Sequence, residues 1–213
     1  FYLAKELFVS GALSDAIARV HQAISVASEL SLHIERLEMF CFLGDCLTAM
    51  GDYEKSYEQL EAALKTFGAG RGYPVVIVAL LTQADATIAQ GLMTHSDKLL
   101  KKAARLLKNV REHGYIQARL YKSRGWMYML KGDFVKSRRA FMLSMLWYRR
   151  THHRFAMAKI MVDFSQLLLR NDQPQRALRM VSYAQRIFKS LDAKGEEKRL
   201  QTLRNAALGL SKN

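Results

Sequence analysis

The feature that most limits the fold of this chain is a turn signal that returns every 40 or 41 residues. Glycine marks four of these turns and an Asn-Asp pair marks the fifth, at the positions Gly11, Gly51, Gly91, Gly132 and Asp172. A fixed period of this length is typical of stacked structural repeats, which bury a continuous core only when several of them pack together. The period therefore predicts an array of five similar units.

Small residues keep the same register as the turns, in three columns. Seven residues before each turn stand Ala4, Gly44, Ala84, Gly125 and Ser165; five after it stand Ala16, Ser56, Ser96, Ser137 and Ala177; twelve after it stand Ala23, Ala63, Ala103, Ser144 and Ala184. A bulky apolar column runs between the last two, through Val20, Leu60, Leu100, Phe141 and Val181. Helices approach within about 8 to 10 Å only where the crossing residues are small. Apolar spacing of three and four residues around these columns predicts amphipathic helices, so we expect an all-α solenoid of antiparallel helix pairs.

The period also sets the expected boundaries. We predict a single domain over 1–213, with repeats at about 1–32, 33–72, 73–113, 114–153 and 154–193, and a capping helix within 194–213 that has no following partner. The chain starts at Phe1 inside a helical pattern, without an initiator Met, so we expect it to be a fragment of a larger protein.

The pattern resembles the tetratricopeptide repeat, whose characteristic residues are clearest in two segments. They are Leu43-Gly44, Leu47, Gly51-Asp52-Tyr53, Ser56, Leu60 and Ala63-Leu64 in the second repeat, and Gly125, Tyr128, Gly132-Asp133-Phe134 and Phe141 in the fourth. The resemblance implies a right-handed superhelix that binds a protein or peptide in its concave groove. The period is longer than the usual 34 residues, as in MalT-type bacterial transcriptional activators, Rap-type regulators and kinesin light chains, and among these the sequence looks most like the MalT type.

Charge is distributed unevenly along the chain. Residues 1–100 hold 7 Lys and Arg against 12 Asp and Glu, a net charge of −5, whereas residues 101–213 hold 26 against 7, a net charge of +19. Such a split creates a one-sided electrostatic field. We therefore expect an acidic or anionic partner, or a neighbouring domain of opposite charge, near the C-terminal half.

The sequence contains no motif that indicates catalysis, a cofactor or a metal site. Cys41 and Cys46 are five residues apart, which fits neither a metal-ligand pair nor a redox CxxC motif, and two reduced thiols favour a cytoplasmic location. No segment approaches the ~20 apolar residues of a membrane-spanning helix. We expect a protein that is not an enzyme, binds no cofactor or metal and has no membrane partner.

In tetratricopeptide proteins the first helix of each pair lines the concave groove, and the residue after its small residue points into it. Transferred to this sequence, that stripe and its neighbouring turns give the predicted partner-binding residues Asp45, Asp85, Arg119, Lys122, Trp126, Lys159, Gln166 and Arg170. The early part of the stripe is acidic and the later part is basic and aromatic. We expect it to hold an acidic or aromatic-rich peptide or an anionic effector. The alternative is that Trp126 packs between helices while the charges remain solvated.

A second set of basic residues is expected on the outer face, at Arg138, Arg139, Arg149 and Arg150. Two functional hypotheses follow. The first is a protein- or peptide-binding scaffold that forms the regulatory or effector-sensing part of a larger protein, for which the resemblance suggests a transcriptional regulator. The second is a nucleic-acid-binding module that uses the basic half through contacts to phosphates. The sequence leaves the oligomeric state open.

Overall fold

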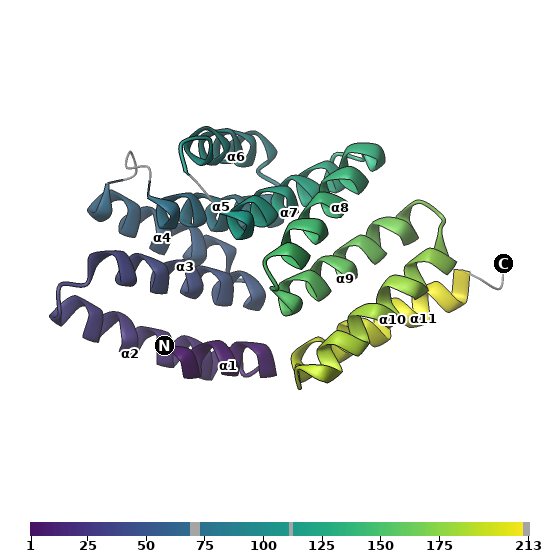
Figure 1. Ribbon diagram of the computed structural model, residues 1–213, viewed down its shortest axis with the longest axis horizontal. Coiled ribbons are helices and arrows are strands. Elements are labelled where there is room, and N and C mark those ends of the chain that lie inside the picture. The colour runs from purple at the N-terminus through teal and green to yellow at the C-terminus, as the bar shows by residue number, and fades with distance from the viewer. Residues whose placement is uncertain (69–72, 111–112, 211–213) are drawn as a thin grey trace.

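The computed structural model describes residues 1–68, 73–110 and 113–210, and these form helices joined by short turns (Figure 1). The helices are α1 (Tyr2–Ser10), α2 (Leu13–Glu29), α3 (His33–Met50), α4 (Tyr53–Phe67), α5 (Pro74–Ala89), α6 (Met93–Leu107), α7 (Gly114–Leu130), α8 (Phe134–Arg150), α9 (Arg154–Arg170), α10 (Pro174–Ser190), the short 3-10 helix η1 (Lys194–Glu196) and α11 (Glu197–Leu210). Ten of them form five antiparallel pairs and α11 covers the last pair, which confirms the predicted all-α superhelical solenoid with a capping helix. The predicted boundaries at 72 and 213 lie outside the described residues.

The turn within each pair explains the period of the sequence. Gly11, Gly51, Gly91 and Gly132 all adopt left-handed backbone conformations with φ between 75° and 93°, and Asp172 takes the same role with φ 51°. This conformation lets the next backbone N–H return to a carbonyl of the preceding turn, which closes the helix end. Asp52, for example, donates its backbone N–H to the Leu47 carbonyl oxygen at 2.9 Å. Glycine recurs because a side chain makes this conformation costly.

The small-residue columns lie where the two helices of a pair cross. Ser56 and Ser137 are fully buried, and each donates its hydroxyl to the carbonyl oxygen of the small residue opposite, Gly44 at 2.9 Å and Gly125 at 2.8 Å. A Cβ on Gly125 would lie 2.6 Å from the Phe141 ring, closer than real contacts allow. The bulky column is buried as well. Its residues belong to four apolar clusters among the described residues, and half-buried side chains such as Phe40, Trp126 and Leu169 connect each cluster to the next.

The two ends of the array meet. Figure 1 shows α1 lying beside the loop that follows α10, and α1 contacts η1. Gly11 and Gly195 approach so closely that a Cβ on Gly11 would lie 2.7 Å from the Gly195 Cα. Phe8 of α1 packs edge-on against Phe155 of α9, with ring centroids 6.4 Å apart. The superhelix therefore curves until its first pair touches its last.

Candidate functional site

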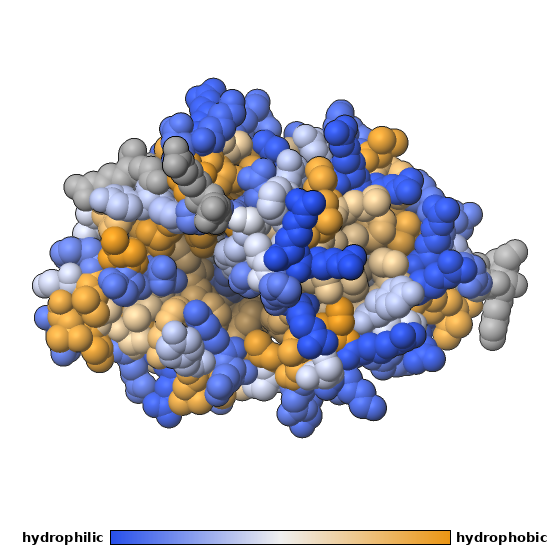
Figure 2. Space-filling model, viewed as in Figure 1, coloured by the Kyte–Doolittle hydropathy of each residue, from blue (hydrophilic) through white to orange (hydrophobic). Residues whose placement is uncertain are grey.

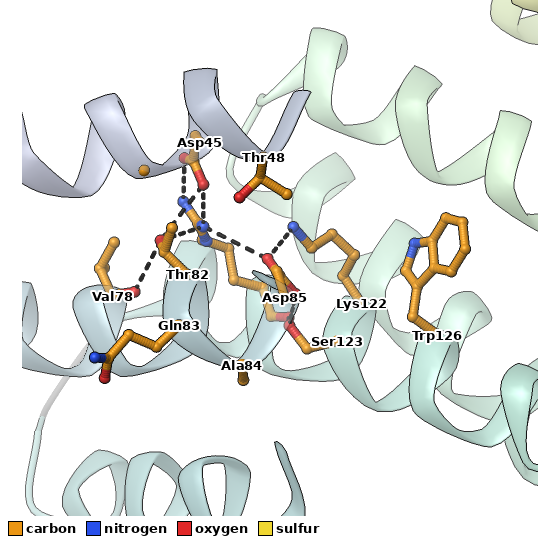
Figure 3. A network of polar contacts seen from close by, with 12 residues as sticks. Asp45, Thr48, Val78, Thr82, Gln83, Ala84, Asp85, Lys122, Ser123 and Trp126 are labelled. Carbon is orange, nitrogen blue, oxygen red and sulfur yellow. Dashed lines mark hydrogen bonds and ion pairs between the residues drawn. The ribbon is translucent and has the colours of Figure 1, made fainter. Parts of the chain in front are cut away.

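The inner stripe begins with an ion pair that skips one helix pair. Arg119 of α7 donates two hydrogen bonds to the carboxylate of Asp45 on α3, at 2.8 and 2.7 Å, and a third to the hydroxyl of Thr82 on α5, at 2.8 Å. Figure 3 labels Asp45 and Thr82, the two acceptors. Arg119 is only 4% exposed, and its Nε has no hydrogen-bond partner among the described residues. The guanidinium is thus enclosed by the protein, so any part it plays in partner binding is indirect.

Asp85 of α5 extends the network to Lys122 and Ser123 of α7. Its carboxylate lies 2.6 Å from the ammonium of Lys122, accepts a hydrogen bond from the Ser123 hydroxyl at 2.5 Å and lies 3.7 Å from Arg119 (Figure 3). Lys122 remains 24% exposed at its side chain. One of its faces is therefore available to solvent or to a ligand.

Trp126 lies one turn further along α7 and connects to the last pair. Its indole N–H donates a hydrogen bond to Asp163 of α9 at 2.9 Å, and the other oxygen of that carboxylate accepts one from Arg199 of α11 at 2.6 Å. Asp163 is buried, whereas Trp126 is half-buried. The indole ring therefore bonds to a neighbouring helix and keeps part of its surface exposed. It bonds within the protein, as expected of a residue packed between helices, and it also presents a surface to a partner, as expected of a groove residue.

Lys159 of α9 lies where the two ends of the array meet. Its ammonium is 3.4 Å from the carboxylate of Glu196 in η1 and lies over the rings of Phe8 and Phe155, at 5.1 and 5.8 Å from their centroids. Its side chain is 31% exposed. This residue therefore joins the polar stripe to the contact that closes the superhelix.

The pairs of the stripe share a spacing in sequence. Four hydrogen bonds join residues that are 37 positions apart: Thr82 with Asp45, Arg119 with Thr82, Lys122 with Asp85 and Trp126 with Asp163. A separation of one repeat less one helical turn arises because each inner helix is shifted along its axis relative to its neighbour by about one turn. The inner helices are α3, α5, α7 and α9, the first helices of the second to fifth pairs. Polar residues at the 37-residue offset form a ladder of hydrogen bonds and ion pairs across these helices.

The surroundings of Asp45 and of the two thiols favour one charge state for each of them. Burial disfavours the charged form of Asp45, but the positive charge and hydrogen bonds of Arg119 outweigh it and hold the pKa of this carboxyl below its usual value. The charges of Lys122 and Lys159 lower the pKa of Asp45 as well. Burial raises the pKa of the Cys46 thiol to about 12 and also raises that of Cys41, so both buried thiols remain protonated.

The remaining predicted groove residues lie toward the end of α9. Gln166 is half-buried and Arg170 is exposed, and neither takes part in the ladder among the described contacts. The four arginines of the predicted outer patch are all exposed on α8, away from the ladder. The structure therefore brings Asp45, Asp85, Arg119, Lys122, Trp126 and Lys159 together and leaves Gln166 and Arg170 at the margin.

Sequence reasoning missed four members of this network, namely Thr82, Asp163, Glu196 and Arg199. Asp163 precedes the small residue Ser165 by two positions, whereas the predicted stripe contains the residue after each small residue and residues from the neighbouring turns. The sequence did contain one sign of these contacts: Trp126 and Asp163 are 37 residues apart, and so are Asp85 and Lys122. Without the axial shift between helices, however, that offset has no special meaning.

The described residues offer little support for other kinds of site. Within 1–68, 73–110 and 113–210 no three His, Cys, Asp or Glu side chains are grouped as metal ligands would be. Over the same residues, no helix has both the length and the apolar character needed to cross a membrane. The polar ladder and the exposed faces around it are therefore the candidate functional site.

The chain resembles known proteins in its fold but not detectably in its sequence. No family model matches the sequence, and no curated protein does. Solved structures do match: a thermophilic TPR protein from Thermus thermophilus (18% identity, TM-score 0.62, 97% of this chain and 96% of the other) and BtubC from P. vanneervenii (14%, 0.61, 94% and 91%). TPR-like repeats of a putative Podospora anserina kinesin light chain are also similar (19%, 0.50, 90% and 93%). The helix pairs, the left-handed turns and these matches together show that the chain has the tetratricopeptide-repeat fold.

Proposed function

We propose that this chain is a protein-interaction scaffold that holds a partner segment against the inner faces of α7 and α9. The observation that carries the proposal is the grouping of Lys122, Trp126 and Lys159, which are partly exposed beside a closed set of ion pairs. An ammonium group has three donors, and among the described residues Lys122 and Lys159 each contact the carboxylate of a single residue. Donors therefore remain for the carboxylates or backbone carbonyls of a partner.

The chemistry of this surface defines the partner class. The half-buried Trp126 offers a flat apolar face with little conformational entropy to lose, and Trp is frequent among residues that dominate binding energy. The ammonium groups of Lys122 and Lys159 favour acidic residues in the partner. The occupant that fits is a peptide segment that carries an acidic residue next to an aromatic or large apolar one, and Arg170 and Gln166 extend its path along α9.

The experiment is a selection of peptides from a random display library on the immobilised chain, followed by affinity measurements on variants. Trp126→Ala should weaken the selected acidic and aromatic peptides by about 2 kcal/mol, or about 30-fold. Lys122→Ala combined with Lys159→Ala should abolish their binding. Arg138→Ala combined with Arg139→Ala is the matched control, because it removes two cations from the outer face. Peptides that bind the inner-surface variants as tightly as the wild type would contradict the proposal.

The same surface suggests a regulatory role within a larger protein, in agreement with the resemblance to MalT-type regulators. Lys159 belongs to the proposed peptide site and also contacts Phe8 and Phe155, the aromatic residues that join the two ends of the array. A partner carboxylate that competes with Glu196 for Lys159 would weaken the contact between α1 and η1, so occupancy would change the curvature of the array. Small-angle scattering with and without a selected peptide tests this, and an unchanged radius of gyration at saturation would exclude it.

A further inference from the structure

The outer face of α8 carries an apolar ridge between two rows of arginine. Val135, Met142 and Leu146 are 75%, 50% and 41% exposed, and spacings of seven and four residues place them along one line of the helix. On an α-helix of 3.6 residues per turn, Arg138 and Arg149 flank this line on one side and Arg139 and Arg150 on the other. The helix contains no Asp or Glu, and no carboxylate in the described part of the chain pairs with these four arginines.

A patch of the opposite charge lies at the turn between α2 and α3. Four large apolar residues, Val26, Leu30, Leu32 and Ile34, are between 40% and 62% exposed there. Figure 2 shows apolar surface gathered at the left edge of this view, where Figure 1 places that turn. The acidic residues of the patch are Glu29, Glu35 and Glu38, all exposed and without an ion pair among the described residues. An apolar surface rimmed by charge is typical of a protein contact rather than of bare solvent exposure.

We propose that these two surfaces bind each other between copies of the chain, the α8 ridge of one copy on the α2–α3 patch of the next. Apolar residues meet apolar residues at the centre of such a contact, and four arginines face three glutamates at its rim. The two patches lie on different helix pairs, and neither α2 nor α3 packs against α8 within one chain. The contact is heterologous, so repetition generates a chain or a closed ring of copies.

The apolar ridge favours a protein rather than nucleic acid as the binding partner of the outer α8 surface. Contacts from cations to phosphates would use the arginines alone, and they leave the exposed line of Val135, Met142 and Leu146 between them without a partner. Association through two small patches falls in the class of weak, transient interfaces. Its rim charges set the rate and the choice of partner, and the apolar centre supplies most of the affinity. This inference goes beyond the proposed function, because it uses neither the ladder nor the peptide site.

Sedimentation of the full chain over a micromolar to millimolar range, at about 0.15 M salt, tests the proposal. We expect the mean mass to rise with concentration. Arg138→Glu with Arg149→Glu should remove this rise, and so should Glu35→Arg with Glu38→Arg; an equimolar mixture of the two variants should regain it, since complementary faces are restored. Arg179→Glu with Arg186→Glu on α10 changes the net charge equally at exposed sites and should leave association intact.

The possible results separate the alternatives. A wild-type chain that stays monomeric throughout overturns the proposal, and so does an equimolar mixture that fails to regain association while both variants keep their circular dichroism and melting temperature. Val135→Ser should weaken self-association without loss of fold. If the arginines instead serve nucleic acid, Val135→Ser leaves duplex DNA binding unchanged, the α8 charge variant loses it with a steep salt dependence, and self-association is absent.

Discussion

Arg119 and Asp45 are 74 residues apart and form two parallel hydrogen bonds, at 2.8 and 2.7 Å, between the fourth and the second helix pairs. The contact spans α5 of the third pair, whose Thr82 hydroxyl accepts a further bond from the same guanidinium. In a repeat array most contacts join neighbours only. This ion pair couples three consecutive pairs, so its loss should affect the cooperativity of the whole array.

Removing the guanidinium should be costly, because it leaves Asp45 without its partner in a largely enclosed site. We expect Arg119→Met to lower the free energy of unfolding by about 3 kcal/mol, the lower end of the range for a broken buried pair, because the Asp45 side chain is 28% exposed. Urea unfolding measures this. Arg119→Met combined with Asp45→Leu should recover much of the loss, whereas Lys65→Met, in an exposed pair with Glu61, should cost less than about 1 kcal/mol. Equal stability of Arg119→Met and wild type would show that the pair is not structural.

Stability should fall at acid pH through the same contact. Arg119 holds the pKa of Asp45 below its value in the unfolded chain, so the ionised carboxylate contributes stability above the unfolded pKa of about 3.9, and this contribution is lost as the pH falls through the folded pKa. Asp45→Asn should reduce stability at neutral pH and flatten the decline below about pH 4. Thermal melts over a pH series test this. Glu58→Gln, at an exposed carboxylate of α4, should leave the acid profile unchanged.

The crossing glycines should tolerate no side chain. Gly125→Ala improves the helix propensity of α7 but places a Cβ 2.6 Å from the fully buried Phe141 ring, so we expect a net loss of about 1 to 3 kcal/mol. Gly209→Ala is the matched control, because nothing lies within 4 Å of its Cβ. This variant should be neutral or slightly stabilising. Differential scanning calorimetry distinguishes the two, and similar melting temperatures for both would be inconsistent with tight packing at the crossing.

The closure of the superhelix should depend on Phe8. Its ring contacts Phe42 and Phe155, with centroids 5.5 and 6.4 Å away, and lies under Lys159. We expect Phe8→Ala to broaden the distance distribution between spin labels at Ser10→Cys and Asp192→Cys, measured by pulsed electron resonance. The native thiols should not compete for the label, since burial raises their pKa values and keeps them protonated.

A control pair of labels separates closure from general loosening. Arg138→Cys and Arg179→Cys lie on α8 and α10 and do not span the contact between the two ends. Their distance distribution should be the same with and without Phe8→Ala. A narrow distribution for the Ser10 and Asp192 pair in the Phe8→Ala variant would mean that contacts other than the Phe8 ring, such as Val9 and the Gly11–Gly195 approach, hold the ends together.

The sequence by itself determined the repeated parts of this protein. The period located every turn within a pair, because a left-handed backbone position requires Gly or a substitute such as Asp172, and the small-residue columns located the helix crossings, because only small residues allow that approach. The resemblance to tetratricopeptide repeats added the prediction that Asp45, Asp85, Arg119, Lys122 and Trp126 share one inner stripe.

Only the tertiary structure decided which members of the stripe touch. A repeat period states which positions are equivalent, but it contains neither the axial shift between neighbouring helices nor the curvature of the array. The shift pairs Lys122 with Asp85 and Trp126 with Asp163, and the curvature brings Phe8 of the first helix pair to Lys159 of the last. Both quantities arise from the sum of many side-chain contacts along the core, so no local pattern in the sequence specifies them.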